Sequence, residues 1–328
     1  MSEFIRIENL KVHYPIRSGF LNRVTDQVKA VDDVSLVFEE GKTYGLVGES
    51  GSGKSTIGKA IIGLEKITSG NIYYNGEEVS KQARNRRSEY RRNVQMIFQD
   101  ALSSFNPKRR ISDILAEPMR NFTDWTPEEE RRRSIELLEI VGLTEDALTK
   151  YPHEFSGGQR QRIGVARAVA INPKLVIADE PVSALDLSVQ AQVLNFMKDI
   201  QKEYGLSYLF ISHDLSVVKH MADDIAIMHR GRFVERGAKN KIFNNPQHIY
   251  TKRLLSAIPQ IDPVNREEHK AHRRAIEQEY HEQQIGYYDE NGRVYDLRTI
   301  EEDHWAALNP NEPSSNKVFV ADQQEGGN

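Results

Sequence analysis

The chain has 328 residues, of which 38% are apolar and 28% are charged, and it contains no cysteine. This composition is ordinary for a folded protein and excludes disorder of the whole chain. The lack of cysteine excludes disulfides, thiolate metal sites and a cysteine nucleophile. No apolar run approaches the roughly 18 residues that a membrane-spanning helix needs.

The net charge of −4 argues against general affinity for nucleic acid. The charge is uneven, because residues 260–328 carry 15 acidic and 7 basic side chains. We therefore expect an acidic C-terminal tail, which is either a solvated appendage or a docking site for a partner. Its Ser-, Asn- and Gly-rich end is expected to be disordered.

Hydrophobic periodicity predicts a mixed α/β body before this tail. Residues 4–14 alternate like a strand, and residues 31–48 indicate two strands separated at Glu40-Gly41. Helices are expected over residues 53–65, 127–141 and 188–204, the second of them after the start signal Thr126-Pro127. Further strands are expected at residues 70–76, 93–99, 175–179 and 207–212, and a hairpin at 223–237.

Residues 48–56 read GESGSGKST, a Gly-x4-Gly-Lys-Ser motif between an apolar strand and a helix. That context is the one required for a phosphate-binding loop. Its backbone N–H groups can converge on phosphate oxygens, and the following helix adds partial positive charge. Lys54 is expected to bridge the β- and γ-phosphates, and the Ser55 hydroxyl to bind Mg²⁺. The expected ATP-binding residues of the loop are Gly48, Glu49, Ser50, Gly51, Ser52, Gly53, Lys54, Ser55 and Thr56.

The phosphate-binding loop alone indicates only that a nucleotide binds, and a second feature narrows the class of protein. The apolar strand at 175–179 ends in Asp179 and is followed by Glu180. Asp179 is placed to hold Mg²⁺, directly or through water. Glu180 is placed to polarise an attacking water molecule. The alternative is a strand that simply becomes polar where it leaves its sheet.

Residues 155–168, FSGGQRQRIGVARA, resemble the signature sequence of ATP-binding-cassette (ABC) ATPases, with Phe155 where leucine is more usual. Physically, a hydroxyl and glycine N–H groups before a helix make a second anion site. The resemblance implies a P-loop NTPase fold, with a RecA-like mixed-sheet core, an antiparallel β subdomain, a helical signature subdomain and a C-terminal extension. Its signature residues are Ser156, Gly157, Gly158 and Gln159.

The same resemblance implies roles for other residues. Gln99 is similar to the Q-loop glutamine that senses the γ-phosphate and Mg²⁺, and His213 to the switch histidine that contacts the γ-phosphate. Tyr14 falls where the family keeps an aromatic residue that stacks on adenine; a core position is the alternative. The implied D-loop is Ser183, Ala184, Leu185 and Asp186. The implied catalytic residues are Glu180, His213, Lys54 and Gln99, and the implied Mg²⁺ ligands are Ser55, Gln99 and Asp179.

In such cassettes two ATP molecules lie between two cassettes, each in the phosphate loop of one chain and the signature of the other. The resemblance therefore implies a second ABC cassette subunit as a partner. Whether the pair is a homodimer or a heterodimer, and whether its two ATP sites are equivalent, stays open.

Two segments resemble the peptide-permease branch of the family. They are the extended segment 98–118 and the sequence NPQHIYTKRLLSAIP at 245–259. Such permeases usually pair two different cassettes with two transmembrane permease subunits and an extracytoplasmic peptide-binding protein. The absence of a cysteine cluster and the insertion at 15–35 after Tyr14 favour the F-type cassette subunit.

We therefore expect an ATP-hydrolysing subunit of an oligopeptide importer, held at the cytoplasmic face of the membrane by its permease subunits. A dipeptide, nickel or other small-solute importer is the alternative. A cassette ATPase of DNA repair or translation is disfavoured, because the chain lacks a long coiled-coil insertion, a zinc module and a second cassette, and no nucleic-acid partner is expected. The expected domains are 1–237 for the cassette, with its helical subdomain at about 100–165, 238–260 for the C-terminal motif and 261–328 for the acidic tail.

Overall fold

The computed structural model describes residues 3–18, 23–80, 89–100, 104–258 and 266–311. The chain divides into two compact units, the first made of residues 1–44 and 55–212 and the second of residues 45–54 and 213–328. Strand β3 (Thr43–Val47) is shared between them. The division gives most of the glycine-rich loop to the second unit and the helix that follows it to the first.

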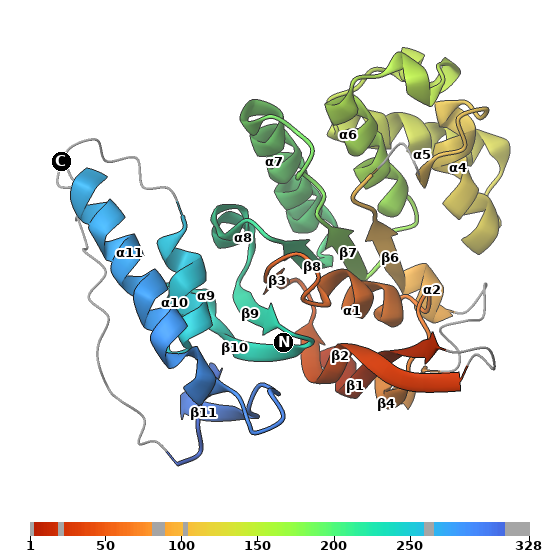
Figure 1. The fold of residues 1–328 in the computed structure, drawn as a ribbon. Coiled ribbons are helices and arrows are strands. Elements are labelled where there is room, and N and C mark those ends of the chain that lie inside the picture. Colours follow the sequence, from red (N-terminus) through yellow and green to blue (C-terminus); the bar gives the residue numbers. More distant parts are fainter. Residues whose placement is uncertain (1–2, 19–22, 81–88, 101–103, 259–265, 312–328) are drawn as a thin grey trace. The chain divides into compact units, whose positions relative to one another are not determined.

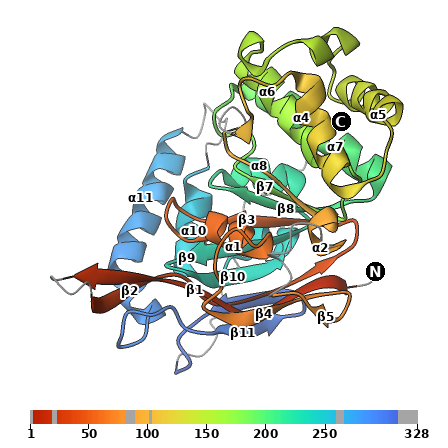
Figure 2. The ribbon, with the colours of Figure 1, turned by 90° about the vertical axis from the view of Figure 1, so that its right-hand side faces the viewer.

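A four-stranded antiparallel sheet begins the first unit, with strand order β2-β1-β4-β5 (Figure 2). Its long hairpin pairs Glu3 with Glu39 at one end and Ser18 with Arg23 at the other. The described residues of the insertion seen in the sequence, 15–18 and 23–35, lie in the two paired strands of this hairpin. The strands are β1 (Glu3–Ser18), β2 (Arg23–Glu39), β4 (Ser69–Tyr74) and β5 (Glu77–Glu78).

Three parallel strands form the core of the first unit, in the order β6-β7-β8. Helix α1 (Lys54–Ile61) packs on them at Gly58, where an added Cβ would lie 3.0 Å from Ile177 and 3.1 Å from Ile211. Parallel strands present their carboxyl ends at one edge, which is where ligands bind in such sheets. The strands are β6 (Val94–Ile97), β7 (Leu175–Asp179) and β8 (Ser207–Ser212).

Helices α4, α5 and α6 pack together as a helical group of the first unit (Figures 1 and 2). Helix α5 begins at the predicted Thr126-Pro127 signal, where Thr126 and Glu129 form a reciprocal capping box. The buried Arg133 on α5 donates to the carbonyl oxygens of Val169 and Ala170 at the end of α6. The helices of this unit beyond α1 are α2 (Glu89–Asn93), α4 (Ile111–Phe122), α5 (Pro127–Ile140), α6 (Gly157–Ala168) and α7 (Leu187–Tyr204).

The second unit holds an antiparallel group of strands in the order β11-β12-β10-β9. Helices α10 and α11 pack against each other in the same unit (Figure 1). Its elements are α8 (Leu215–Met221), β9 (Asp224–His229), β10 (Arg232–Ala238), α9 (Lys239–Asn244), α10 (Ile249–Ser256), α11 (Arg266–Gln283), β11 (Leu297–Glu301) and β12 (His304–Ala307).

The acidic tail is not the solvated appendage that its composition suggested, because part of it is packed into the second unit. Strand β12 pairs with β10, and the Nε2 atom of His304 lies 2.7 Å from the Oε1 atom of Glu235, with both side chains fully buried. Glu235 also accepts hydrogen bonds from the N–H groups of Gln247 and His248. The tail is therefore part of the second unit over its strands. The expected disorder of the last 12 or so residues falls outside the described part of the chain.

Among the described residues, none of the helices combines the length and the hydrophobicity that a transmembrane span requires.

Candidate functional site

The glycine-rich loop lies in the second unit and encloses the ammonium group of Lys54. The Nζ atom donates to the carbonyl oxygens of Gly48 at 2.7 Å and Glu49 at 2.8 Å, and it lies 3.4 Å from the Ser52 hydroxyl. Lys54 is only 4% exposed. A buried ammonium group needs such oxygen partners. The loop thus encloses the ammonium group of Lys54 with its own carbonyl oxygens.

The conformation of the loop depends on its glycines and on the β9–β10 turn behind it. Gly51 and Gly53 have φ angles of +80° and +109°, which favour glycine. A Cβ at Gly48 would lie 2.2 Å from the carbonyl oxygen of Met228. The N–H of Gly231 donates to the carbonyl oxygen of Ser52 at 3.0 Å. A side chain at position 48 would therefore collide with the backbone of β9.

The first unit brings Ser55 and Asp179 together. The Ser55 hydroxyl donates to the Oδ1 atom of Asp179 at 2.7 Å, and Asp179 is 5% exposed at the end of β7. A hydroxyl beside a buried carboxylate is a set of hard oxygen donors, which is the set that Mg²⁺ prefers. The two residues predicted from separate motifs therefore form one oxygen-rich site.

Gln99 and Glu180 also lie together in the first unit. The Nε2 atom of Gln99 donates to the Oε2 atom of Glu180 at 3.0 Å. Glu180 has a φ angle of +47°, and its N–H donates to the carbonyl oxygen of Ile211 at 2.9 Å. A non-glycine residue in this conformation is strained, and such strain is typical of functional sites.

The signature residues form the start of helix α6. The Ser156 hydroxyl accepts from the N–H of Gln159, and the Gln159 side chain accepts from the N–H of Ser156, so the helix has a capping box. A Cβ at Gly158 would lie 2.4 Å from Val189 on α7, whereas one at Gly157 would meet only Leu185 at 4.0 Å. Gly158 is required by packing, while Gly157 is exposed at the N-terminus of the helix.

The predicted D-loop residues lead into helix α7. The Asp186 carboxylate accepts from the N–H of Val189 at 3.0 Å and caps that helix. This backbone hydrogen bond, with help from Ser188, holds the pKa of Asp186 below its ordinary value. Ser183 turns back to donate to the carbonyl oxygen of Glu180 at 3.1 Å. The predicted segment Ser183–Asp186 is thus connected both to Glu180 and to the helix beside the signature.

His213 and Tyr14 complete the predicted set. His213 is exposed and is the first residue of the second unit after β8, which ends the first unit in the chain. Tyr14 is 39% exposed on β1, opposite Val28. Partial burial raises the pKa of Tyr14, and the nearby Glu65 raises it further. Tyr14 is therefore not a core residue, which was the alternative, and its ring is accessible to a ligand.

Sequence reasoning missed two residues that contact the loop. Tyr250 and Arg253, both on α10, bind the main chain and the side chain of Glu49. The available signal was the motif at 245–259, which indicates the subfamily but does not by itself indicate what its side chains contact.

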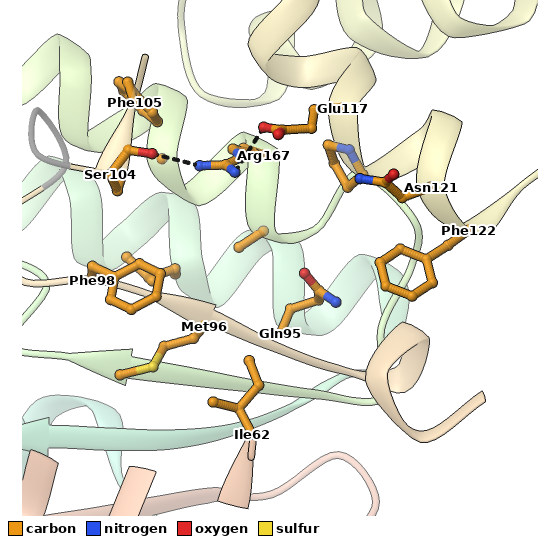
Figure 3. Close-up of a pocket in the computed structure, with 14 residues that line it drawn as sticks. Ile62, Gln95, Met96, Phe98, Ser104, Phe105, Glu117, Asn121, Phe122 and Arg167 are labelled. Atoms are coloured by element: carbon orange, nitrogen blue, oxygen red, sulfur yellow. Dashed lines mark hydrogen bonds and ion pairs between the residues drawn. The ribbon is translucent and has the colours of Figure 1, made fainter. Parts of the chain in front are cut away.

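A pocket of about 190 Å³ lies in the first unit, between β6 and the helices α4 and α6 (Figure 3). Arg167 lies on one side of it and donates to the carbonyl oxygen of Ser104 at 3.1 Å and to Glu117 at 2.9 Å. Phe98 and Phe122 line it as well. The pocket therefore begins one residue before Gln99 and combines apolar rings with the half-exposed ion pair of Arg167 and Glu117.

Comparison with known proteins gives consistent results. The family profile described as ABC transporter matches residues 31–183, and the one described as oligopeptide/dipeptide transporter, C-terminal region, matches residues 234–286. The oligopeptide transport ATP-binding protein OppF of Lactococcus lactis subsp. lactis (strain IL1403) is 60% identical over 308 residues, which cover 94% of this chain and 97% of that protein.

More distant matches agree. The dipeptide transport ATP-binding protein DppF of Escherichia coli (strain K12) is 48% identical, covering 79% of this chain and 78% of that protein. Among solved structures, the dimeric ATP-binding cassette MJ0796 in a post-hydrolysis state, bound to ADP and Pi, is 26% identical with a TM-score of 0.62. That match covers 72% of this chain and 98% of the MJ0796 chain.

The fold and these matches define a P-loop ATPase of the ABC class. The chain belongs to the ABC transporter family, among the ATP-binding subunits of oligopeptide and dipeptide transporters. It therefore binds and hydrolyses ATP as one subunit of a transporter. The expected fold class and the expected activity are confirmed.

Proposed function

We propose that this chain powers the uptake of oligopeptides by a multi-subunit importer, as the F-type cassette subunit. The main support for a peptide substrate is the match of residues 234–286 to the C-terminal region of oligopeptide/dipeptide transporters. The 60% identity to OppF, which extends over 94% of this chain, supports oligopeptides in particular. The peptide itself is not expected to contact this chain.

In this proposal the loop at 48–56 binds the triphosphate of ATP. The ammonium group of Lys54 is already buried against carbonyl oxygens before the nucleotide binds. On binding, Lys54 exchanges these carbonyl partners for β- and γ-phosphate oxygens. Ser55 and Asp179, joined by their 2.7 Å hydrogen bond, fit an Mg²⁺ ion, with Gln99 as a further ligand. When bound, the ion would neutralise charge that develops on the phosphates.

Glu180 is the proposed base for hydrolysis. Its carboxylate polarises the water that attacks the γ-phosphate in line, and Gln99 orients that carboxylate through the 3.0 Å hydrogen bond. His213 contacts the γ-phosphate in this proposal, although it belongs to the second unit. The other residues of the loop at 48–56 bind and position the nucleotide in this proposal.

The proposed functional assembly contains two cassettes, because the signature serves the ATP that is bound to the partner's loop. Gly157 and the capped start of α6 offer N–H groups to that γ-phosphate. The dimeric state of the MJ0796 cassette supports this arrangement. Two transmembrane permease subunits and an extracytoplasmic peptide-binding protein complete the system, which would hold this chain at the cytoplasmic face of the membrane.

The pocket beside Gln99 is the proposed docking site for a permease subunit. It is lined by the apolar rings of Phe98, Phe105 and Phe122, and it begins next to the residue that senses the phosphate (Figure 3). A short amphipathic permease segment that fills this pocket would be moved when Gln99 moves. Closure of the cassettes on ATP is thereby coupled to the transmembrane subunits.

The substrate is tested by reconstituting the complete assembly in lipid vesicles with its binding protein. We expect ATP-dependent uptake of labelled peptides of several residues, and turnover that rises when these peptides are present. Nickel and dipeptides serve as the competing substrates. Uptake of nickel but not of peptides, or of dipeptides alone, would refute the oligopeptide assignment while leaving the ATPase assignment intact.

Tyr14→Ala tests the proposed adenine contact. The substitution removes a ring that is accessible on β1, so it should raise the KM for ATP several-fold and leave turnover at saturating ATP nearly unchanged. Stacking of this kind contributes about 1 kcal/mol. Tyr14→Phe, which keeps the ring, is the matched control and should behave as wild type. A large fall in saturated turnover with an unchanged KM would contradict stacking.

A further inference from the structure

Three polar groups of Glu49, in the middle of the glycine-rich loop, are bound within the second unit. Its carbonyl oxygen accepts from the Nζ atom of Lys54 at 2.8 Å. Its N–H donates to the hydroxyl oxygen of Tyr250 at 3.1 Å, and its carboxylate pairs with the Nη1 atom of Arg253 at 3.0 Å. One residue therefore connects helix α10 to the lysine of the loop.

The two α10 side chains are themselves held firmly. Tyr250 is fully buried, and its ring centroid lies 4.2 Å from that of His229. Burial raises the pKa of Tyr250, so its phenol stays neutral and available as a hydrogen-bond acceptor. Arg253 stacks at 4.6 Å on the ring of Tyr280 and pairs with Glu277 at 2.9 Å, both on α11. These contacts restrict the rotamers of both side chains before any ligand binds.

The start of α10 is fixed as well. The buried Glu235 accepts from the N–H groups of Gln247 and His248, and His248 caps the helix by accepting from the N–H of Tyr250 at 3.1 Å. Glu235 is in turn paired with His304 of the tail. A continuous set of contacts thus runs from the tail through α10 to the loop.

We propose that Tyr250 and Arg253 are positioning residues for the phosphate loop. By fixing the peptide group and the side chain of Glu49, they hold the loop in the conformation that receives the nucleotide. The loop then loses its conformational entropy during folding and not when ATP binds, which is the general benefit of preorganisation. The C-terminal region of this chain therefore sets the ATP affinity of its own loop.

This inference rests on the proposed binding of ATP at the loop, and one set of variants tests both. In Tyr250→Phe the buried ring stays and only the acceptor for the Glu49 N–H is lost. We expect the dissociation constant for ATP of the full-length chain, and the KM of the complete assembly, to rise about fivefold, as for one hydrogen bond. Turnover at saturating ATP should change less than twofold.

The matched control is Tyr208→Phe, which removes one equally buried phenol hydrogen bond, to the carbonyl oxygen of Met197 in the first unit. This control should lower the melting temperature and leave ATP affinity unchanged. Arg253→Gln should weaken ATP binding as Tyr250→Phe does, and Arg253→Lys should recover part of the loss because it keeps a charge for Glu49.

Equal ATP affinity in wild type and Tyr250→Phe would overturn the positioning role, as would an equal loss of affinity in Tyr208→Phe. Lys54→Ala separates this outcome from a failure of the proposed function. If Lys54→Ala binds ATP as wild type does, the loop is not the ATP site and the proposed function fails. If Lys54→Ala loses binding and Tyr250→Phe does not, only the positioning role fails.

Discussion

Glu180→Gln should stop hydrolysis while ATP remains bound. The amide keeps the shape of the side chain and can still accept the hydrogen bond from Gln99, but it cannot take a proton from water. Loss of a general base typically costs between 10² and 10⁴ in rate, so we expect turnover to fall about thousandfold. Binding of radiolabelled ATP to the assembled transporter and release of phosphate should be measured on the same preparation.

The control for this substitution is Glu203→Gln, which removes the same charge from an exposed position on α7. It should hydrolyse ATP at the wild-type rate. We further expect the Glu180→Gln assembly to accumulate as a closed dimer with trapped ATP, because binding persists and release requires hydrolysis. Turnover of Glu180→Gln at the wild-type rate would show that the base has been assigned wrongly.

Gly157→Asp should inactivate the ATP site that is formed with the partner's loop. A carboxylate beside the γ-phosphate is repelled by about 4 kcal/mol at 4 Å and an effective dielectric of 20, which is about thousandfold. The structure shows why this substitution is a clean test. A Cβ at Gly157 meets only Leu185, at 4.0 Å, and an acidic residue at a helix N-terminus stabilises the helix.

Gly157→Asn is the matched control, because it has nearly the same shape and no charge. Its effect on turnover should be less than tenfold. Gly158 is unsuitable for this test, since any side chain there would collide with Val189. ATP trapping resolved by site, in an assembly with one variant cassette, would show which site fails. Failure at the loop of the variant chain itself, with the partner's site intact, would contradict the arrangement across two chains.

Short motifs allowed much of the candidate site to be predicted from the sequence. A Gly-x4-Gly-Lys-Ser motif can bind phosphate only if a strand precedes it and a helix follows, and the hydrophobic pattern indicated both. Asp179 could be assigned from the hydrophobic pattern as well. A continuous apolar run that ends in a carboxylate predicts a buried strand whose end lies at the ligand-binding edge of the sheet. The structure adds the 2.7 Å contact between Ser55 and Asp179, which lie far apart in the sequence.

The structure of the C-terminal region could not be predicted from its residue pattern. Its composition is charged and its strands are short, so neither hydrophobic period nor β-propensity identifies β11 and β12. Burial of the hydrogen-bonded contact between His304 and Glu235 depends on strand pairing between residues far apart in the chain, and composition does not encode that pairing.

The class of ATPase and the residue types that handle the phosphates could be inferred from local motifs, because those residues must follow one another at fixed spacing. The residues that hold the loop could be identified from the folded chain alone. The contacts of Tyr250 and Arg253 with Glu49 join positions about two hundred residues apart through the packing of α10, and long-range packing leaves no local pattern.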